Sequence, residues 1–297
     1  METYNLTASI VTYQNDFSRL YKTISSFISS PLKVKLYIID NSPTDTLKAH
    51  ILKINDSKGS NGSTNSSITY IFNQGKNIGY GSAHNKAISE CLKFSKYHVI
   101  LNPDLYFHSE VLEKLYQLME DDLEIGLITP KILYPNNNMQ ACCKLIPTPL
   151  NLFVRRFIKI KKISESLNKK YELLDFGYNK IMEIPIISGC FMFFRATTLK
   201  DIGLFDERFF MYLEDVDLCR RVHHYYHFKD NDKNKNKKYK VIFNPSTTIY
   251  HDYEKGSYKN IKLLMYHLSS SIKYFNKWGW FFDSERKKIN QNALKSI

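Results

Sequence analysis

Runs of apolar residues that end near an aspartate are the sequence feature that most constrains the fold of this chain. The run Val34–Ile39 is nearly continuously apolar and stops at Asp40, and Val99–Leu101 is followed by the motif NPD, which ends at Asp104. Runs without an apolar–polar alternation are typical of parallel strands buried on both faces. Helical spacing of apolar residues between the strands, as in Asp16–Ser29, then predicts an α/β fold with a mainly parallel central sheet flanked by helices.

Further segments extend this pattern. Strands are also predicted over Leu6–Tyr13, Ile68–Phe72 and residues 186–194, whereas Lys53–Ser67 is rich in Gly, Ser and Asn and predicts a surface loop. In an open parallel sheet, ligands bind beyond the carboxyl ends of the strands. Asp40 and Asp104 occupy such positions, although a single aspartate there is also common as a turn former.

A third acidic group follows the predicted strand Cys190–Phe194. After a short helix and an aromatic-rich turn, the sequence reaches Glu214, Asp215 and Asp217. The helix dipole favours acidic residues in a first helical turn, and Asp217 has the spacing of a surface ion pair with Arg221. These residues alone therefore leave a purely structural role open for all three carboxylates.

The composition limits which cellular compartment and which binding partners are expected. The chain has 42 Lys and Arg residues against 29 Asp and Glu residues, which implies an anionic partner such as nucleic acid, a membrane surface or a phosphorylated substrate. No nucleic-acid recognition module is visible, and the charge is dispersed or in loops. The five cysteines form no CxxC pair, and neither a secretory signal nor a membrane-spanning run is seen, so a cytosolic protein is expected.

The segment Asn73–Gly81 (NQGKNIGYG) is a candidate phosphate loop. It contributes flexible backbone and amide groups, including Asn77 and Gly79, near the same edge of the predicted sheet. It lacks both the P-loop signature and the dinucleotide-binding fingerprint. A simple glycine turn into a helix explains it equally well.

The order of several motifs resembles one known family. The motifs are LTASIVTYQND, LYIIDNSPTD, NQGKNIGYGSAHNKAI, ILNPD, SGCFMFFRATTLKDIGLFDERFFMYLEDVDLCRR and IYHDYEKGS. Together they resemble a family 2 glycosyltransferase of the GT-A fold, and within that family the rhamnosyltransferase-like branch that builds bacterial surface polysaccharides. The resemblance spans Leu6 to Ser257. It implies a catalytic domain over residues 1–257 and a C-terminal helical, amphipathic extension over residues 258–297.

The resemblance implies an activity and a donor site. Family members transfer a sugar from a nucleotide diphosphate donor with inversion. Asp40 is then expected to contact the base or ribose of the nucleotide, and Asn77, Gly79 and Asn102 are expected in the same donor site. Asn102 stands where the family's DxD motif has its first acidic residue, which leaves fewer protein carboxylates for a metal ion.

The resemblance also implies a metal site and a catalytic base. Asp104 matches the metal-binding aspartate of DxD, and His251 matches a histidine that completes the site, so Mg²⁺ or Mn²⁺ is expected. A structural hydrogen bond is the alternative for His251. Asp215 is predicted to be the base that takes the acceptor's proton, with Glu214 orienting the acceptor or the base. Asp217 is expected to hold the start of the helix through an ion pair with Arg220 or Arg221. Either arginine could instead reach the diphosphate of the donor. The aromatic turn Phe205–Tyr212 is a candidate wall of the acceptor site.

The predicted function is transfer of a sugar, for example rhamnose from dTDP-rhamnose, to a lipid-linked glycan or a surface polysaccharide such as lipopolysaccharide or capsule. A UDP-galactose or UDP-N-acetylglucosamine donor and a non-catalytic nucleotide-sugar-binding protein are the alternatives. The aromatic and basic segment Lys259–Lys288 could lie on an anionic membrane, which predicts a cytoplasmic protein peripheral to the inner face of the plasma membrane. Packing of this segment on the core is the competing interpretation.

Overall fold

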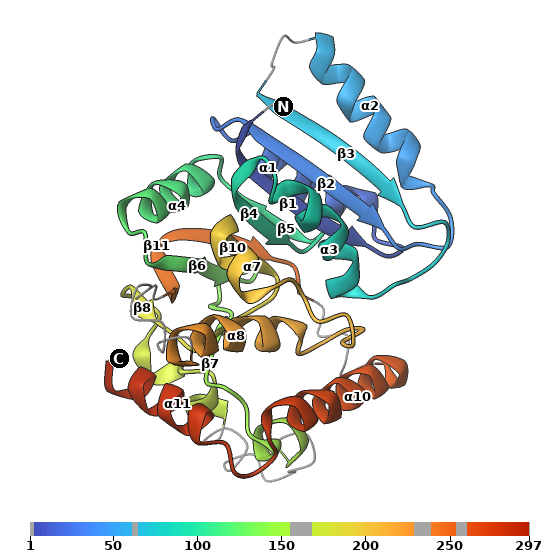
Figure 1. Cartoon of the computed structure of the whole chain (residues 1–297). Helices are drawn as coiled ribbons and strands as arrows, with labels where there is room; N and C mark the ends of the chain where they lie inside the picture. The colour runs from blue at the N-terminus through green and yellow to red at the C-terminus, as the bar shows by residue number, and fades with distance from the viewer. Residues whose placement is uncertain (1–2, 61–64, 155–167, 229–238, 254–259, 297) are drawn as a thin grey trace.

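The structure is a computed structural model that describes residues 3–60, 65–154, 168–228, 239–253 and 260–296. A nine-stranded mixed sheet forms its centre (Figure 1). In chain order its strands are β1 (Tyr4–Thr12), β2 (Val34–Asp40), β3 (Ser66–Phe72), β4 (Ser95–Leu101), β5 (Leu105–Phe107), β6 (Ile125–Leu133), β8 (Met182–Glu183), β10 (Phe191–Arg195) and β11 (Lys240–His251). The strand order is β3-β2-β1-β4-β10-β6-β11-β5, and β8 pairs with β11.

The N-terminal half of the sheet is parallel, as the sequence predicts. β1 pairs with both β2 and β4, and Thr12 lies opposite Asp40 while Ile10 lies opposite Leu101. β3 continues the parallel pairing with Phe72 opposite Asp40. The carboxyl ends of these strands therefore meet at one edge, where a binding site is expected.

The predicted strand over residues 186–194 is divided in the structure. Its first part, β9 (Ile186–Ile187), pairs with β7 (Cys143–Lys144) in a separate two-stranded sheet, and only its second part, β10, lies antiparallel between β4 and β6. The break falls at Ser188 and Gly189, because their backbone groups are bonded elsewhere. The Ser188 N–H donates to the Cys142 carbonyl, and the Gly189 N–H donates to Asp215.

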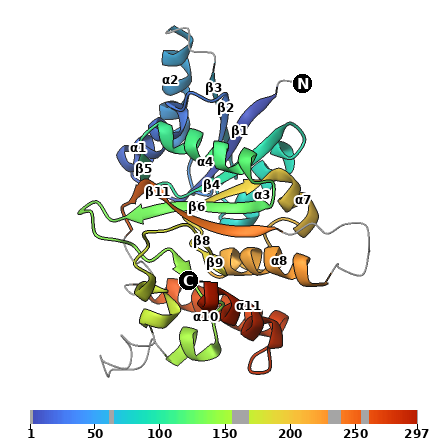
Figure 2. The same ribbon diagram turned by 90° about the vertical axis from the view of Figure 1, so that its left-hand side faces the viewer.

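Helices cover both faces of the sheet (Figures 1 and 2). The helices of the described residues are α1 (Phe17–Ile28), α2 (Leu47–Ser60), α3 (Tyr80–Cys91), α4 (Glu110–Asp121), α7 (Ala196–Ile202), α8 (Glu214–Phe228), α10 (Ile261–Trp278) and α11 (Ser284–Ser296), with short turns η1 (Leu150–Val154) and η2 (Leu174–Phe176). The prediction of a loop from Lys53 was wrong, because α2 continues to Ser60. Leu47, Ile51 and Ile54 are buried at helical spacing, so packing outweighs the local composition.

The C-terminal helices α10 and α11 lie next to α8, at the end of the molecule away from α2 and β3 (Figures 1 and 2). Tyr274 and Phe275 are completely buried, and the Phe275 ring lies 5.2 Å from that of Trp280. One face of α10 is therefore packed on the rest of the chain, as one of the two interpretations of the C-terminal segment expects. The proposed domain boundary at residue 257 lies outside the described residues.

A buried polar chain joins β1, α3 and β4 inside the core. The Ser9 hydroxyl oxygen lies 2.7 Å from His84 Nδ1 and 2.8 Å from His98 Nε2, and Thr7 Oγ1 lies 2.9 Å from His98 Nδ1. Burial lowers the pKa of His98 to about 3 and that of His84 well below its usual range. Both imidazoles are therefore neutral in the folded protein.

These two histidines should each make the fold less stable on acidification. The unfolded chain binds protons at both histidines below about pH 6.5, whereas the folded chain does not, so their contribution to the free energy of unfolding falls as the pH drops. The raised pKa values of His251 and Glu214 act in the opposite direction, so the contribution of His84 and His98 is measured as a difference between two proteins. Between pH 7.5 and pH 5.5, chemical denaturation should show that the wild type loses about 3 kcal/mol more than a His84→Gln, His98→Gln variant. The same pH dependence in both proteins would contradict the assignment.

Candidate active site

A cleft of about 1380 Å³ opens at the edge of the sheet where β1 and β4 end. Its walls come from the segments that follow these strands, from the turn before β10 and from the start of α8. The predicted site residues that line it are Asn77, Gly79, Asn102, Asp104, Glu214, Asp215 and His251. Residues that are far apart in the sequence thus meet in one place.

Asp40 does not line this cleft. Its side chain is completely buried at the end of β2, where Oδ2 accepts a hydrogen bond from the Tyr70 hydroxyl at 2.7 Å. Oδ1 accepts from the Ser42 backbone N–H at 2.9 Å. In the structure these bonds hold the carboxylate inside the protein, so its contact with a nucleotide stays a prediction.

The loop before α3 is fixed against the segment that precedes α8. Gly79 has φ +90°, and a Cβ at this position would lie only 2.5 Å from the Phe210 carbonyl oxygen. The Asn77 side chain accepts a hydrogen bond from the Gly79 N–H at 3.0 Å and from Asn41 Nδ2 at 3.2 Å. The loop is therefore rigidly held, and glycine is required at position 79 because of both the backbone conformation and the close contact.

Strand pairing brings Asp104 and His251 together. Asp104 immediately precedes β5, His251 ends β11, and the antiparallel register of these strands places His251 opposite Leu105. As a result, His251 Nε2 lies 3.2 Å from Asp104 Oδ1. Asn102 Nδ2 lies 3.3 Å from the same ring nitrogen.

The surroundings of this pair suit a cation. Asp104 Oδ1 is buried and accepts no hydrogen bond apart from its contact with the His251 ring. On the other side of the ring, His251 Nδ1 lies 3.0 Å from Gln140 Oε1, an acceptor, so Nδ1 carries a hydrogen and Nε2 faces the aspartate. Burial by itself lowers the pKa of His251, but Cys190 and Asp104 outweigh it and raise the pKa to about 10. The nitrogen that binds this proton is the one that would bind a metal ion instead.

The two carboxyl groups at the start of α8 have different environments. Asp215 is partly exposed to the cleft, and its oxygens accept hydrogen bonds from the N–H groups of Gly189 at 2.9 Å and Val216 at 2.8 Å. Glu214 is buried, and its Oε2 has no hydrogen-bond donor. Burial and the nearby Asp215 raise the pKa of Glu214 well above its usual range, so its surroundings favour the protonated form.

The backbone that presents these carboxyl groups is strained. Tyr212 and Leu213 have φ values of +70° and +66°, and both lie in the left-handed region directly before Glu214. Non-glycine residues in this region cost free energy and are concentrated at functional sites. Within the aromatic turn, Met211 and Tyr212 line the cleft, whereas Phe205 and Phe209 are buried in the core.

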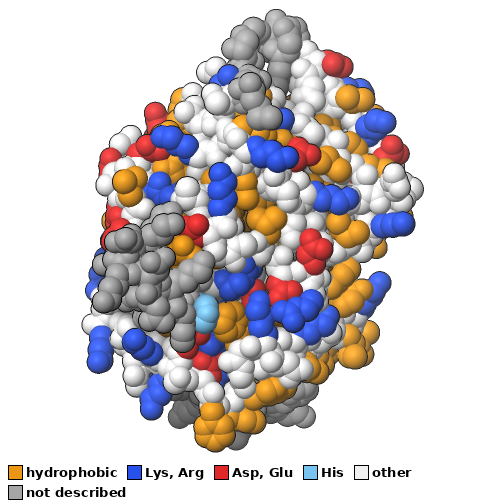
Figure 3. All heavy atoms as spheres, in the orientation of Figure 1, with side chains coloured by type: hydrophobic (Ala, Val, Ile, Leu, Met, Phe, Trp, Pro, Cys, Tyr) orange, Lys and Arg blue, Asp and Glu red, His pale blue; other side chains and the backbone are white. Residues whose placement is uncertain are grey.

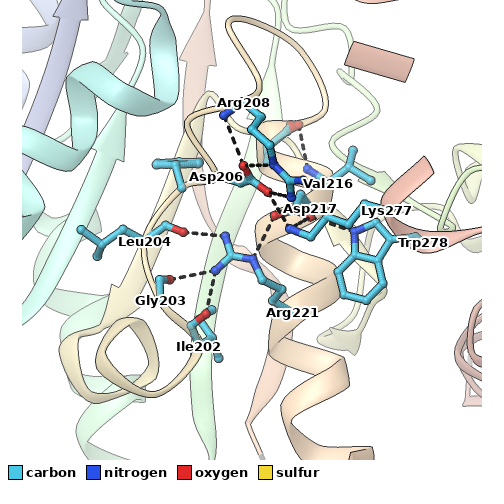
Figure 4. Close-up of polar contacts among 12 residues, drawn as sticks. Ile202, Gly203, Leu204, Asp206, Arg208, Val216, Asp217, Arg221, Lys277 and Trp278 are labelled. Atoms are coloured by element: carbon cyan, nitrogen blue, oxygen red, sulfur yellow. Dashed lines mark hydrogen bonds and ion pairs between the residues drawn. The ribbon is translucent and has the colours of Figure 1, made fainter. Parts of the chain in front are cut away.

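Asp217 has the structural role that the sequence predicts. Its Oδ2 accepts a hydrogen bond from Arg221 Nε at 2.9 Å, and its Oδ1 accepts from Lys277 Nζ at 2.7 Å and Trp278 Nε1 at 2.8 Å (Figure 4). The Arg221 guanidinium also donates to the Ile202, Gly203 and Leu204 carbonyls at the end of α7. This network attaches α10 to α8 and α7.

Arg220 is engaged in a second buried network. Its Nη2 lies 2.7 Å from Asp283 Oδ1 and 3.3 Å from Glu285 Oε2. Its guanidinium also lies 4.3 Å from the centre of the Trp278 ring. Neither Arg220 nor Arg221 lines the cleft, so the structure does not support the alternative in which one of them reaches the diphosphate.

Some cleft residues were missed by the sequence reasoning. Tyr80 lines the cleft and contacts both Asn102 and Gly189, and its position in the NIGYG motif was an available signal. Gln140 orients His251, yet it lies in a segment without a motif, so no sequence signal could have found it. Cys190 also lines the cleft, and its carbonyl accepts a hydrogen bond from the Asn102 N–H at 2.8 Å.

The architecture is the GT-A fold of glycosyltransferases. Among solved structures, the chain is similar to GalNAc-T7 crystallised with UDP, GalNAc and Mn²⁺, with a TM-score of 0.57 and 15% identity over 85% of this chain and 44% of that one. At this identity the likeness shows the fold alone. It confirms the predicted fold class.

The family follows from the sequence match. The model of glycosyl transferase family 2 matches residues 8–203, so the chain belongs to that family. It is 25% identical over 222 residues to the low-salt glycan biosynthesis hexosyltransferase Agl10 of Haloferax volcanii, covering 73% of this chain and 61% of that protein. It is 24% identical over 161 residues to an N-acetylglucosaminyl-diphospho-decaprenol L-rhamnosyltransferase of Mycobacterium tuberculosis, covering 50% of this chain and 51% of that protein. The chain thus spans between half and two thirds of these relatives, and the predicted resemblance to the rhamnosyltransferase-like branch is confirmed.

Proposed function

We propose that this chain transfers a sugar from a nucleotide diphosphate donor to a glycan acceptor by a metal-dependent, inverting reaction. The observation that carries the proposal is the single cleft in which the Asp104–His251 pair and Asp215 meet. The similarity to a rhamnosyltransferase favours dTDP-rhamnose as the donor. UDP-galactose and UDP-N-acetylglucosamine are the alternatives to be compared with it.

The Asp104–His251 pair would hold the metal ion. A buried carboxylate oxygen beside an imidazole nitrogen fits Mg²⁺ or Mn²⁺. Within the described residues there is no group of three or more His, Cys, Asp and Glu side chains that could hold a metal. Donor phosphate oxygens or water would therefore complete the coordination, and a bound ion would neutralise charge on the leaving diphosphate.

Asp215 would act as the base. It accepts the proton of the acceptor hydroxyl while that oxygen bonds to the anomeric carbon and the bond from this carbon to the diphosphate oxygen breaks. Attack from the face opposite the leaving group inverts the configuration. The surroundings of Glu214 favour its protonated form, which makes it the poorer base of the two, so we assign it the role of orienting the acceptor or Asp215.

The proposed acceptor is a lipid-linked glycan at the inner face of the plasma membrane. Exposed apolar side chains on and after α10 support a membrane contact, because Ile261 is 80% exposed and Phe281 and Phe282 are also largely exposed. On the face in Figure 3, Lys and Arg side chains are spread over much of the surface, in keeping with the basic composition of the chain. Over the part of the chain that the structure describes, no helix has the length and apolarity that a membrane span requires.

Substitution of Asp104 by Asn tests the metal site. In the wild-type protein, Mn²⁺ with the correct nucleotide sugar should raise the melting temperature, because a ligand that binds only the folded state stabilises it by mass action. Asp104→Asn should lose the Mn²⁺-dependent part of this shift, and turnover should fall by roughly 100-fold or more. The matched control is Asp252→Asn, which removes a partly exposed carboxylate paired with Arg19 and should keep the shift. An unchanged Mn²⁺ response in Asp104→Asn would remove Asp104 from the metal site.

A further inference from the structure

Tyr80, the first residue of α3, places its hydroxyl group between two parts of the cleft. The hydroxyl oxygen lies 3.0 Å from Asn102 Oδ1 and 2.9 Å from the Gly189 carbonyl oxygen. Both neighbours are acceptors, and the hydroxyl has one hydrogen, so it donates to one of them at a time. Burial raises the pKa of Tyr80 well above its usual range, and nearby carboxylates raise it further, so the hydroxyl stays a donor.

The two acceptors belong to the two functional halves of the cleft. Asn102 lies in the NPD motif with Asp104, and its Nδ2 is 3.3 Å from His251 Nε2. The Gly189 N–H donates to Asp215 Oδ2 at 2.9 Å. A side chain at position 189 would crowd this contact, because a Cβ there would lie 3.0 Å from the Asp215 Cβ. The Tyr80 hydroxyl therefore lies in contact with a neighbour of the proposed metal pair on one side and with a neighbour of the proposed base on the other.

Packing fixes the position of this hydroxyl group. The Tyr80 N–H donates to the Phe210 carbonyl at 2.9 Å, and the ring lies 4.4 Å from that of His84 and 6.3 Å from that of Phe205. A side chain held in this way keeps its polar end in place without help from a substrate. The hydroxyl group can therefore fix the positions of Asn102 and Gly189, which both lie in turns.

We propose that Tyr80 is a positioning residue that holds the NPD segment and the Gly189 turn at the separation needed for transfer. This inference rests on the proposed function, because it assigns the metal pair to one side of the transferred sugar and Asp215 to the other. Misplacing a reacting group by about 1 Å costs on the order of 100-fold in rate, and this sensitivity makes the separation important.

The test is Tyr80→Phe, which keeps the ring and removes only the hydroxyl oxygen. We expect kcat for sugar transfer to fall by about 10- to 100-fold. The KM for the donor and the Mn²⁺ concentration for half-maximal activity should stay within about twofold, because no binding group is removed. A general structural defect would instead change kcat, KM and metal dependence together.

The matched control is Tyr239→Phe. The Tyr239 hydroxyl is also in the protein interior and donates to Asp201 Oδ2 at 2.6 Å, but this residue does not line the cleft. This variant should lose thermal stability and keep the wild-type kcat. The positioning role would be overturned if Tyr80→Phe kept the wild-type kcat, or if its loss of catalytic efficiency came entirely from a raised KM. Either result would leave the proposed function intact. A wild-type protein that turns over no nucleotide sugar would overturn both.

Discussion

Replacement of Asp215 by Asn should lower kcat by about 1000-fold while donor binding is retained. General base catalysis contributes between roughly 100- and 10,000-fold, and an amide of the same shape cannot accept the acceptor's proton. Asn can keep one oxygen as an acceptor for the Gly189 N–H, so the cleft should remain formed. The measurements are initial rates at saturating donor and acceptor, together with the melting-temperature shift caused by the donor.

Glu214→Gln is the matched comparison for this prediction. Burial raises the pKa of Glu214 and favours a neutral carboxyl group, and Gln replaces it with a neutral amide of similar shape. We therefore expect a much smaller loss, below about tenfold, since no catalytic proton acceptor is removed. Equal losses in both variants, or full turnover in Asp215→Asn, would contradict the assignment of Asp215 as the base.

Replacement of Arg220 by Met should destabilise the protein by about 3 kcal/mol. The side chains of Arg220 and Asp283 are 1% and 2% exposed, so removing the guanidinium leaves a buried carboxylate without its nearest cation. Breaking one partner of a buried pair costs about 3–5 kcal/mol. We expect the lower end, because Arg286 Nη1 remains 3.8 Å from Asp283 Oδ2. Chemical denaturation at pH 7.5 measures the loss.

Two further variants distinguish loss of the Arg220–Asp283 ion pair from the general effect of a substitution on stability. Adding Asp283→Asn to Arg220→Met should recover part of the lost stability, because a neutral amide then replaces the buried carboxylate while Arg286 still donates to backbone carbonyls. Lys114→Met breaks an exposed pair with Glu110 on α4 and should leave the stability unchanged within error. A wild-type stability for Arg220→Met would show that α10 and α11 do not depend on this network.

The parts of the site that depend on local sequence could be predicted. The apolar runs before Asp40 and Asp104 identify parallel strands, and parallel strands place their carboxyl ends together. The structural role of Asp217 was also accessible, because its partner Arg221 is four residues away on the same helix.

The rest depends on contacts between distant segments. The Asp104–His251 distance is set by the register of β11 on β5, which no local pattern reveals. Asp40 is withdrawn from the cleft because Tyr70, from the neighbouring strand, donates to it. Arg220 and Arg221 are adjacent in the sequence, and only the packing of α11 decides that Arg220 pairs with Asp283.

Release of nucleotide diphosphate is the most direct test of the central claim. The purified chain would be incubated with dTDP-rhamnose, UDP-galactose and UDP-N-acetylglucosamine, with and without an acceptor glycan, in Mn²⁺, Mg²⁺ or EDTA. We predict that one donor is consumed, that an acceptor accelerates its consumption, and that EDTA or Asp215→Asn abolishes it. A wild-type protein that binds a nucleotide sugar and releases no nucleotide diphosphate under any of these conditions would contradict the claim and identify a non-catalytic binding protein.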